Sequence, residues 1–309
     1  MTFFLGIDGG GTKTRCLIGD ENSVLGTGTS TSCKVQRVGE ACARDSLSAA
    51  IHEACVQPGI SPRQITRTCA GITGSGRIEI ANVMRDLLSS IVGGEIEIIA
   101  DVEIAFEDAF GSGPGLIVIA GTGSIAYGRN AEGQTARAGG WGHAISDEGS
   151  GYWIGREAVR LTLRQHDNEN KPVLLKDLMQ VIGAEGFDDF ILRVNTDPQP
   201  DYAAMFPAIV AAADRGDALA KRVLHSAADE LAELAKAVIR LLYQDLNRVV
   251  IAIHGGVLTN GVLVRETVMR ELKTKYQQIS FLSPAIEPAR GALNRARREF
   301  LAEFKAPGV

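Results

Sequence analysis

Two apolar segments of this 309-residue chain each run directly into a glycine-rich turn. Segment 3–7 leads into the turn at 8–14, and segment 116–120, about 110 residues later, leads into the turn at 121–124. After each turn an extended pattern resumes, and a further turn closes a hairpin. The chain therefore contains a weak internal repeat, which matters for function when both copies carry the same chemistry.

The repeat predicts two α/β domains. Glycines between 111 and 115 mark the boundary, and at ~100–200 residues per domain the length also favours two. We expect an N-terminal domain over 1–115 and a C-terminal domain over 116–309, with the option that the last helix, about 289–304, packs back on the N-terminal domain. The other main helices are expected at 40–57, 78–92, 152–166, 203–214 and 218–243.

Charge and composition exclude several classes of protein. The chain has 32 Lys and Arg against 37 Asp and Glu, so no basic excess is present to bind a nucleic-acid backbone. Its apolar runs are far shorter than the ~20 residues that span a bilayer, and the first is too short for a signal sequence. The five cysteines all lie in the first quarter, without the spacing of a metal motif. We expect a cytoplasmic protein with no nucleic-acid or membrane partner.

The turn after the first strand suits a phosphate group. Gly9, Gly10 and Gly11 expose several backbone N–H groups in a small concavity, which phosphate oxygens fit. A strand rather than a helix follows, so the turn is neither a Walker loop nor a Rossmann loop. A plain glycine hairpin is the alternative. Asp8 favours the phosphate site, because it could hold a hydrated magnesium ion close to the phosphates.

The second turn adds the hydroxyl groups of Thr122 and Ser124 to another backbone cradle. Two such turns, one in each half, indicate a clamp on a nucleotide triphosphate. Asp101 lies between them in sequence and follows a predicted strand at 95–99. We interpret it as a general base that accepts the proton of an attacking hydroxyl, since phosphoryl transfer otherwise needs mainly positioning and charge neutralisation. A helix N-cap is the alternative for Asp101.

The stretch 139–155 indicates a sugar site. It contains both tryptophans, Trp141 and Trp153, in a segment too rich in glycine for an ordinary core. An aromatic ring beside carboxylates is a common way to hold a sugar, because the ring covers C–H faces while the acids accept hydroxyl hydrogens. A glycosidase is disfavoured because its two carboxylates face each other across a bond, whereas Asp147 and Glu148 are adjacent in sequence.

Together these segments resemble the N-acetylglucosamine kinases of the BadF/BadG/BcrA/BcrD ATPase family, over nearly the whole chain. The resemblance rests on GIDGGGTKT at 6–14, the aspartate at 101, AGTGS at 120–124, the GGWGH and DEGSGYWIG motifs within 139–155, and the weaker HGGV at 254–257. It implies two ribonuclease-H-like domains of the actin-type ATPase architecture with an interdomain cleft. It also implies a homodimeric phosphotransferase with an alcohol group as acceptor, which uses ATP and Mg²⁺ to phosphorylate N-acetylglucosamine at its 6-hydroxyl.

The resemblance assigns roles by position. Asp101 would be the base, and Asp8 would organise magnesium through water. The residues implied in ATP binding are Gly9, Gly10, Gly11, Thr12, Lys13, Gly121, Thr122, Gly123, Gly255, Gly256 and Asn260. The residues implied in the sugar site are Ser32, Lys34, Gly71, Asp101, Ser124, Gly140, Trp141 and Asp147.

The loop at 30–36 departs from the family pattern. Family members have an asparagine there that contacts sugar hydroxyls, whereas this loop contains none, so that Ser32 or Lys34 would occupy the position. A plain surface loop is an equal alternative. If Lys34 enters the pocket, the preferred sugar would differ, for instance by carrying a negative group such as the lactyl ether of N-acetylmuramic acid.

Other functions stay open at this point. Glucosamine, N-acetylmuramic acid or another hexose are alternative substrates. An ATPase activator of a 2-hydroxyacyl-CoA dehydratase or benzoyl-CoA reductase system is a further alternative. Such an activator needs thiolate ligands for an iron–sulfur cluster, and the chain has no cysteine after Cys69 and no close pair.

Overall fold

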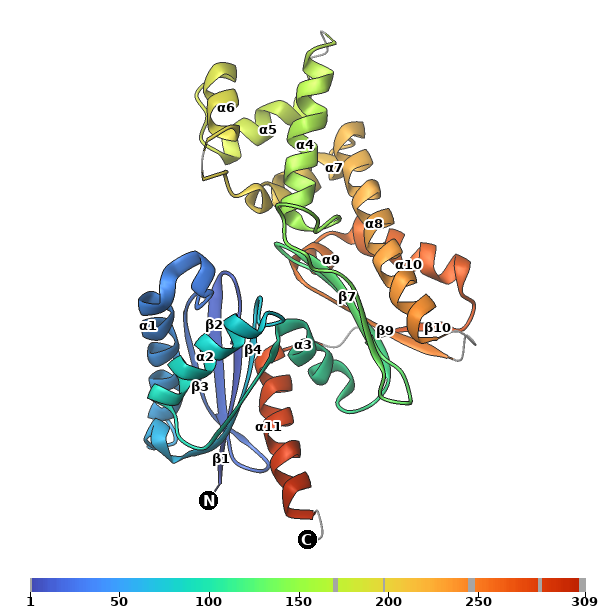
Figure 1. Cartoon of the computed structure of the whole chain (residues 1–309). Helices are drawn as coiled ribbons and strands as arrows, with labels where there is room; N and C mark the ends of the chain where they lie inside the picture. Colours follow the sequence, from blue (N-terminus) through green and yellow to red (C-terminus); the bar gives the residue numbers. More distant parts are fainter. Residues whose placement is uncertain (1, 169–171, 197, 244–247, 283–284, 306–309) are drawn as a thin grey trace. The chain divides into compact units, whose positions relative to one another are not determined.

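The computed structural model describes residues 2–168, 172–196, 198–243, 248–282 and 285–305 (Figure 1). The chain divides into two compact units, Met1–Gly113 with Pro284–Val309, and Pro114–Ser283. The C-terminal segment, which carries the last helix, therefore belongs to the first unit. The domain limits expected from the sequence stay a prediction, and each unit is described by itself.

The sheet of the first unit brings three strand ends to one edge. Its strand order is β3-β2-β1-β4-β5. The bounds are Phe3–Gly9 (β1), Lys13–Gly19 (β2), Val24–Thr31 (β3), Ile65–Ile72 (β4) and Glu95–Ala100 (β5). β1, β4 and β5 are parallel, with Gly9 paired to Ile72 and Ile72 to Ala100. Whatever follows these three strands therefore starts from the same edge of the sheet.

Helices cover both faces of this sheet (Figure 1). They are α1 (Val35–Val56), α2 (Ile78–Ile91), α3 (Asp101–Phe110) and α11 (Pro288–Lys305), with a short 3₁₀ turn at Pro62–Gln64. Successive side chains of a strand point to opposite faces. Leu5 accordingly packs in the cluster that includes α1 and α2 residues, whereas its neighbour Phe4 packs with α3 and α11 residues.

The second unit repeats this topology in order β10-β9-β6-β7-β8. Again a meander of three antiparallel strands adjoins two parallel ones. The strands are Gly115–Ala120 (β6), Ser124–Arg129 (β7), Thr135–Gly139 (β8), Val249–His254 (β9) and Ile279–Leu282 (β10). The shared topology confirms the α/β fold class and explains the internal repeat in the sequence.

The helices of the second unit follow β8 and β9. They are α4 (Gly151–His166), α5 (Val173–Val181), α6 (Phe187–Val194), a 3₁₀ turn at Tyr202–Met205, α7 (Phe206–Asp214), α8 (Ala218–Leu242), α9 (Gly256–Asn260) and α10 (Val262–Lys275). Residues of α8 such as Leu231 and Val238 are fully buried against β6 in one continuous core. In the described part of the chain, no helix is both long and apolar enough to cross a membrane.

A glycine allows α11 to lie directly on α3. A Cβ atom at Gly291 would overlap the carbonyl oxygen of Ile104 and would lie 2.7 Å from the backbone nitrogen of Asp108. The ion pair between Arg290 and Asp108, 2.7 Å from Nε to Oδ1, closes the same contact. The position of α3, which begins with Asp101, therefore depends on close backbone packing against α11.

We predict that Gly291→Ala lowers the free energy of unfolding by about 1–3 kcal/mol, because overpacking a tight contact forces backbone to shift. Alanine has the better helix propensity by ~1 kcal/mol, so a loss cannot come from the helix itself. Gly76→Ala is the control, since a Cβ atom there meets nothing within 4 Å. Urea unfolding of both variants measures the effect, and equal stabilities would contradict it.

Candidate functional site

The first glycine turn is closed by a backbone hydrogen bond, and part of its backbone is accessible from outside. The Gly10 N–H donates to the Lys13 carbonyl at 3.0 Å, which fixes the turn between β1 and β2. A Cβ atom at Gly11 would meet nothing within 4 Å except Lys34 Cδ, at 4.0 Å. The backbone at Gly11 and the exposed Thr12 is therefore accessible to a ligand.

Residues after β3 hold this turn in place. Buried Ser32 donates from its hydroxyl to the Gly10 carbonyl at 3.2 Å and accepts the Lys34 N–H at 3.2 Å. Arg37 donates from Nη1 to the Gly11 carbonyl at 2.7 Å. The Ser32 hydroxyl is thus used inside the protein, and the sugar role implied for it stays a prediction. Sequence reasoning missed Arg37, because its partner lies 26 positions away and no motif marks it.

Asp8, the penultimate residue of β1, carries an unfavourable charge. It lies opposite Arg15 in the β1–β2 ladder. Burial and, to a smaller extent, the charge of Asp101 raise the pKa of Asp8 to about 6, although the charges of Lys13 and Arg15 lower it. A carboxylate held this way, near a second one, suits a hard cation with oxygen ligands. These oxygen donors fit Mg²⁺, and the implied role of Asp8 in holding the ion stays a prediction.

Asp101 is held by donors on both carboxylate oxygens. It is the first residue of α3, directly after β5. Oδ2 accepts the Thr73 hydroxyl at 2.6 Å, and Oδ1 accepts the Val102 N–H at 2.9 Å. The N-cap position belongs to Ala100, whose N–H donates to Glu103 Oε1 at 3.2 Å. The structure thus assigns the N-cap to another residue and leaves Asp101 oriented at the edge of the sheet.

Gly71 leaves room for α3, the helix that begins with Asp101. It is buried in β4, and a Cβ atom there would overlap the side chain of Ile104. A glycine at this position therefore allows α3 to lie close behind Asp101. Its implied contact with a sugar stays a prediction.

In the second unit, the turn at 121–124 is built like the first. The Gly121 N–H donates to the Gly123 carbonyl at 2.9 Å, and the Gly151 N–H donates to the Gly121 carbonyl at 2.8 Å. A Cβ atom at Gly121 would meet nothing within 4 Å, and Thr122 is exposed. Backbone and hydroxyl groups are again accessible to a ligand.

Asp147 lies against this turn in a strained conformation. Its φ is +67°, the one positive value of a non-glycine residue in the described ranges. It is buried, and its Oδ2 lies 2.9 Å from the position of a Cβ atom at Gly123. Burial raises the pKa of Asp147, while the Gly142 N–H, which donates to Oδ1 at 3.3 Å, lowers it. Backbone strain at a buried polar residue is typical of functional sites.

Further implied sugar residues lie beside Asp147. The Ser124 hydroxyl donates to the Glu148 carbonyl at 2.7 Å, and the Gly140 N–H donates to the Ser124 carbonyl at 2.9 Å. The structure therefore gathers Ser124, Gly140 and Asp147 in one cluster of the second unit.

The two tryptophans have different environments. Trp141 is 64% exposed, and the guanidinium carbon of Arg137 lies 4.2 Å from its ring centroid. Its free face suits the C–H face of a sugar. Trp153 instead packs, partly buried, against the core of the second unit. The expectation that both rings lie in a segment too rich in glycine for core was wrong for Trp153, because the segment becomes α4 at Gly151 and turns this ring inward.

The glycines after β9 lie beside the second turn. Gly255 has a φ of +98°, and a Cβ atom there would overlap the backbone of Ala120, directly before Gly121. Exposed Gly256 and Asn260 begin and end α9, with Asn260 Nδ2 3.9 Å from the position of a Cβ atom at Gly256. The pairing of β9 with β6 therefore places Gly255 and Gly256, which are implied in binding ATP, close to the second glycine turn.

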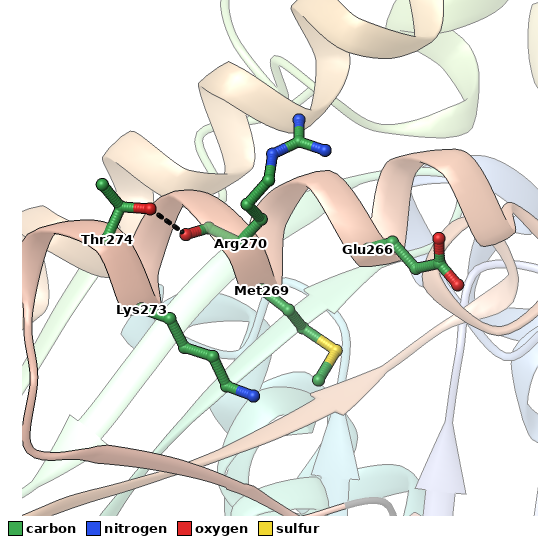
Figure 2. A pocket seen from close by; sticks show the side chains of 5 residues that line it. All are labelled: Glu266, Met269, Arg270, Lys273 and Thr274. Atoms are coloured by element: carbon green, nitrogen blue, oxygen red, sulfur yellow. Dashed lines mark hydrogen bonds between the residues drawn. The ribbon is translucent and has the colours of Figure 1, made fainter.

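A surface pocket on α10 is separate from these clusters. It has a volume of about 430 Å³ and is lined by Glu266, Met269, Arg270, Lys273 and Thr274. In Figure 2 the Arg270 side chain points away from those of Glu266, Met269 and Lys273, and the Thr274 hydroxyl is bonded to the Arg270 carbonyl. The charged ends do not converge on a common point, so the pocket adds no candidate site.

We predict that Asp8→Asn stabilises the protein near neutral pH. The folded-state pKa of about 6 exceeds the unfolded value near 3.8, so ionisation of Asp8 costs stability. This cost is absent below about pH 4, grows through pH 6 and is complete above it. At pH 7.5 the variant should be more stable by about 1–3 kcal/mol, and at pH 4 it should match the wild type.

Urea unfolding at the two pH values checks the sign. Asp20→Asn is the control. Because the N–H groups of Asn22 and Ser23 lower the pKa of Asp20, this variant should be less stable than the wild type at pH 7.5. A stability difference for Asp8→Asn that does not change between pH 4 and 7.5 would contradict a raised pKa of Asp8.

Comparisons with known proteins extend over both units. The model of the BadF/BadG/BcrA/BcrD ATPase family matches residues 5–296. An N-acetylmuramic acid/N-acetylglucosamine kinase of Clostridium acetobutylicum is 33% identical, covering 97% of this chain and 99% of the relative. The N-acetyl-D-glucosamine kinase of Dictyostelium discoideum is 27% identical, covering 94% and 96%.

A solved structure agrees with these relatives. That of a candidate N-acetylglucosamine kinase from Chromobacterium violaceum has a TM-score of 0.77 at 25% identity, covering 95% of this chain and 98% of that one. The fold and the expected enzyme class, a phosphotransferase with an alcohol group as acceptor, are confirmed. Since the family model spans nearly the whole sequence, this chain belongs to the BadF/BadG/BcrA/BcrD ATPase family.

Proposed function

We propose that the protein transfers the γ-phosphoryl group of ATP to the 6-hydroxyl of N-acetylglucosamine, with Asp101 as general base. The observation that carries the proposal is the Asp101 carboxylate, oriented through both oxygens at the edge of the sheet where the first glycine turn also begins. Its position after β5 gives it the geometry of a group that accepts the proton of an attacking hydroxyl.

The two glycine turns would bind the phosphates. Phosphoryl transfer depends mainly on positioning and on neutralising charge. Gly11 and Thr12 of the first unit, and Gly121 and Thr122 of the second, offer open backbone and hydroxyl groups for this purpose. The proposal assigns both turns to the same ATP molecule, with Gly256 and Asn260 near its adenosine.

Asp8 is the residue proposed to bind magnesium. Asp8 would hold the ion through water, which is consistent with a single half-buried carboxylate beside a second acidic group. When bound, the ion supplies neutralisation of the phosphate charge. Lys13 and Arg15 partly offset the charge of Asp8 on the protein side.

The sugar would contact the cluster around Asp147. Its buried carboxylate suits sugar hydroxyls, and the exposed ring of Trp141 suits the apolar face. The amino-sugar kinases among the relatives support a substrate of this class. We further propose that the enzyme is a cytoplasmic homodimer.

The activator alternative is disfavoured by the thiols. An iron–sulfur cluster needs accessible thiolates. Four of the five cysteines are buried, and burial raises the pKa of each of these four thiols. Cys42 is the exposed one.

We predict that Asp101→Asn lowers kcat by about 10²–10⁴ with little change in ATP binding, because the amide cannot accept the proton. A coupled assay of ADP release with N-acetylglucosamine measures kcat, and ³¹P NMR identifies the product. Asp86→Asn, on the exposed side of α2, is the control and should retain full turnover. Near-normal turnover of Asp101→Asn would reject its role as base.

A second candidate substrate is N-acetylmuramic acid. Partly exposed Lys34 lies beside Gly11, with its Cδ 4.0 Å from the position of a Cβ atom there, so its ammonium group could bind an anionic substituent of a sugar. The clostridial relative, which is named for both sugars, is consistent with this candidate.

Lys34→Met is expected to lower kcat/KM for N-acetylmuramic acid about tenfold, the equivalent of ~1.4 kcal/mol, and to change that for N-acetylglucosamine much less. Methionine keeps the length of the side chain and removes its charge. Lys34→Asn restores the asparagine typical of the family and should shift preference in the same direction. Unchanged preference in both variants would dispose of this role for Lys34.

A further inference from the structure

We propose that Thr73 is a positioning residue, which holds the Asp101 carboxylate in the orientation needed for phosphoryl transfer. The inference rests on the proposed function and assigns a residue that none of the sequence motifs includes. Its basis is the hydrogen bond from the Thr73 hydroxyl to Asp101 Oδ2, at 2.6 Å.

Thr73 lies in a tight turn whose backbone is fixed by a hydrogen bond and by a glycine. The turn spans Ile72–Ser75, since the Ser75 N–H donates to the Ile72 carbonyl at 3.1 Å. Gly74 takes the third position of the turn with a φ of +89°, a value that glycine adopts without steric cost. Thr73 takes the second position and directs its side chain to the neighbouring strand end.

The turn is fastened to both neighbouring strands. The Thr73 N–H donates to the Gly9 carbonyl at the end of β1, at 3.1 Å. The Ser75 hydroxyl donates to the Ile99 carbonyl of β5, at 2.7 Å. The Thr73 hydroxyl therefore starts from a fixed backbone, and it is not needed to close the turn itself.

The consequence for Asp101 is a fixed rotation of its carboxylate. Thr73 holds one oxygen and the Val102 N–H holds the other. A hydrogen bond to an ionised acceptor is short and about twice as strong as a neutral one. Each carboxylate oxygen accepts from two directions, so one direction on each stays available for the substrate proton. Because Thr73 touches Asp101 and not the reacting atoms, it acts through the base.

The test compares Thr73→Val with Thr73→Ser in steady-state kinetics with ATP and N-acetylglucosamine. Valine keeps the shape and removes the hydroxyl. It should lower kcat about 10- to 100-fold, the effect of a lost charged hydrogen bond, while KM for the sugar and for ATP changes less than about threefold. Serine keeps the donor and should restore kcat to within about threefold of the wild type.

Thr68→Val is the matched control. Thr68 lies on the same strand-and-turn segment, and its buried hydroxyl has no hydrogen-bond partner in the described structure, so its loss should leave kcat unchanged. Thr73→Val is also placed in the Asp101→Asn background. In that background Thr73→Val should lower kcat less than about twofold, because the orientation of residue 101 no longer limits the rate once the base is absent.

The outcomes separate the two proposals. A wild-type protein that forms no sugar phosphate overturns the proposed function, and this inference with it. An active wild type with full kcat in Thr73→Val overturns this inference alone, as does an equal loss of kcat in the Asp101→Asn background. Circular dichroism verifies folding, and if the valine variant does not fold, Thr73→Ala is measured in its place with the same expectations.

Discussion

The first unit keeps a half-buried carboxylate, Asp8, near a second one, Asp101, at one edge of its sheet. Asp8 is the penultimate residue of β1, and Asp101 directly follows β5, a strand of the same parallel set. Burial together with the charge of Asp101 raises the pKa of Asp8 to about 6. The fold keeps these groups near each other at a cost in stability, which is the usual sign of a site rather than of a core. Three contacts fix the elements around this pair: the tight packing of α11 on α3, the turn at Thr73, and the Arg15–Glu287 ion pair, 2.6 Å from Nη2 to Oε1.

The second unit uses the same topology with a different source of strain. Its glycine turn also connects the first two strands, yet the charged group near it comes from the long loop before α4 rather than from a strand end. Asp147 accepts a left-handed backbone and burial, and both cost free energy. In each unit, then, an unfavourable carboxylate lies beside an open glycine turn.

Much of the fold could be predicted from the sequence, because β1, β6 and β9 are apolar and run into glycines. The helix expected at 40–57 is longer in the structure, since α1 continues through the non-helical Gly39 to Val35. Helices α5, α6 and α10 were not predicted. Helices α5 and α6 span nine and eight residues, which is too short for a helical period to be recognised, and α10 has only four buried residues, Val264, Thr267, Val268 and Leu272, among its 14. At the site, the glycine turns and Asp101 carry local signals. Thr73 and Arg37 do not, because their roles depend on partners 28 and 26 positions away.

The course of the chain has a consequence for biosynthesis. The chain leaves the first unit after Gly113 and returns to it at Pro284. One face of the first sheet therefore lacks α11 while the whole second unit is being made. On the ribosome, Phe4 and Leu17 would have only α3 beside them until α11 emerges, so the unit that is translated first would complete its core after the second unit has been made.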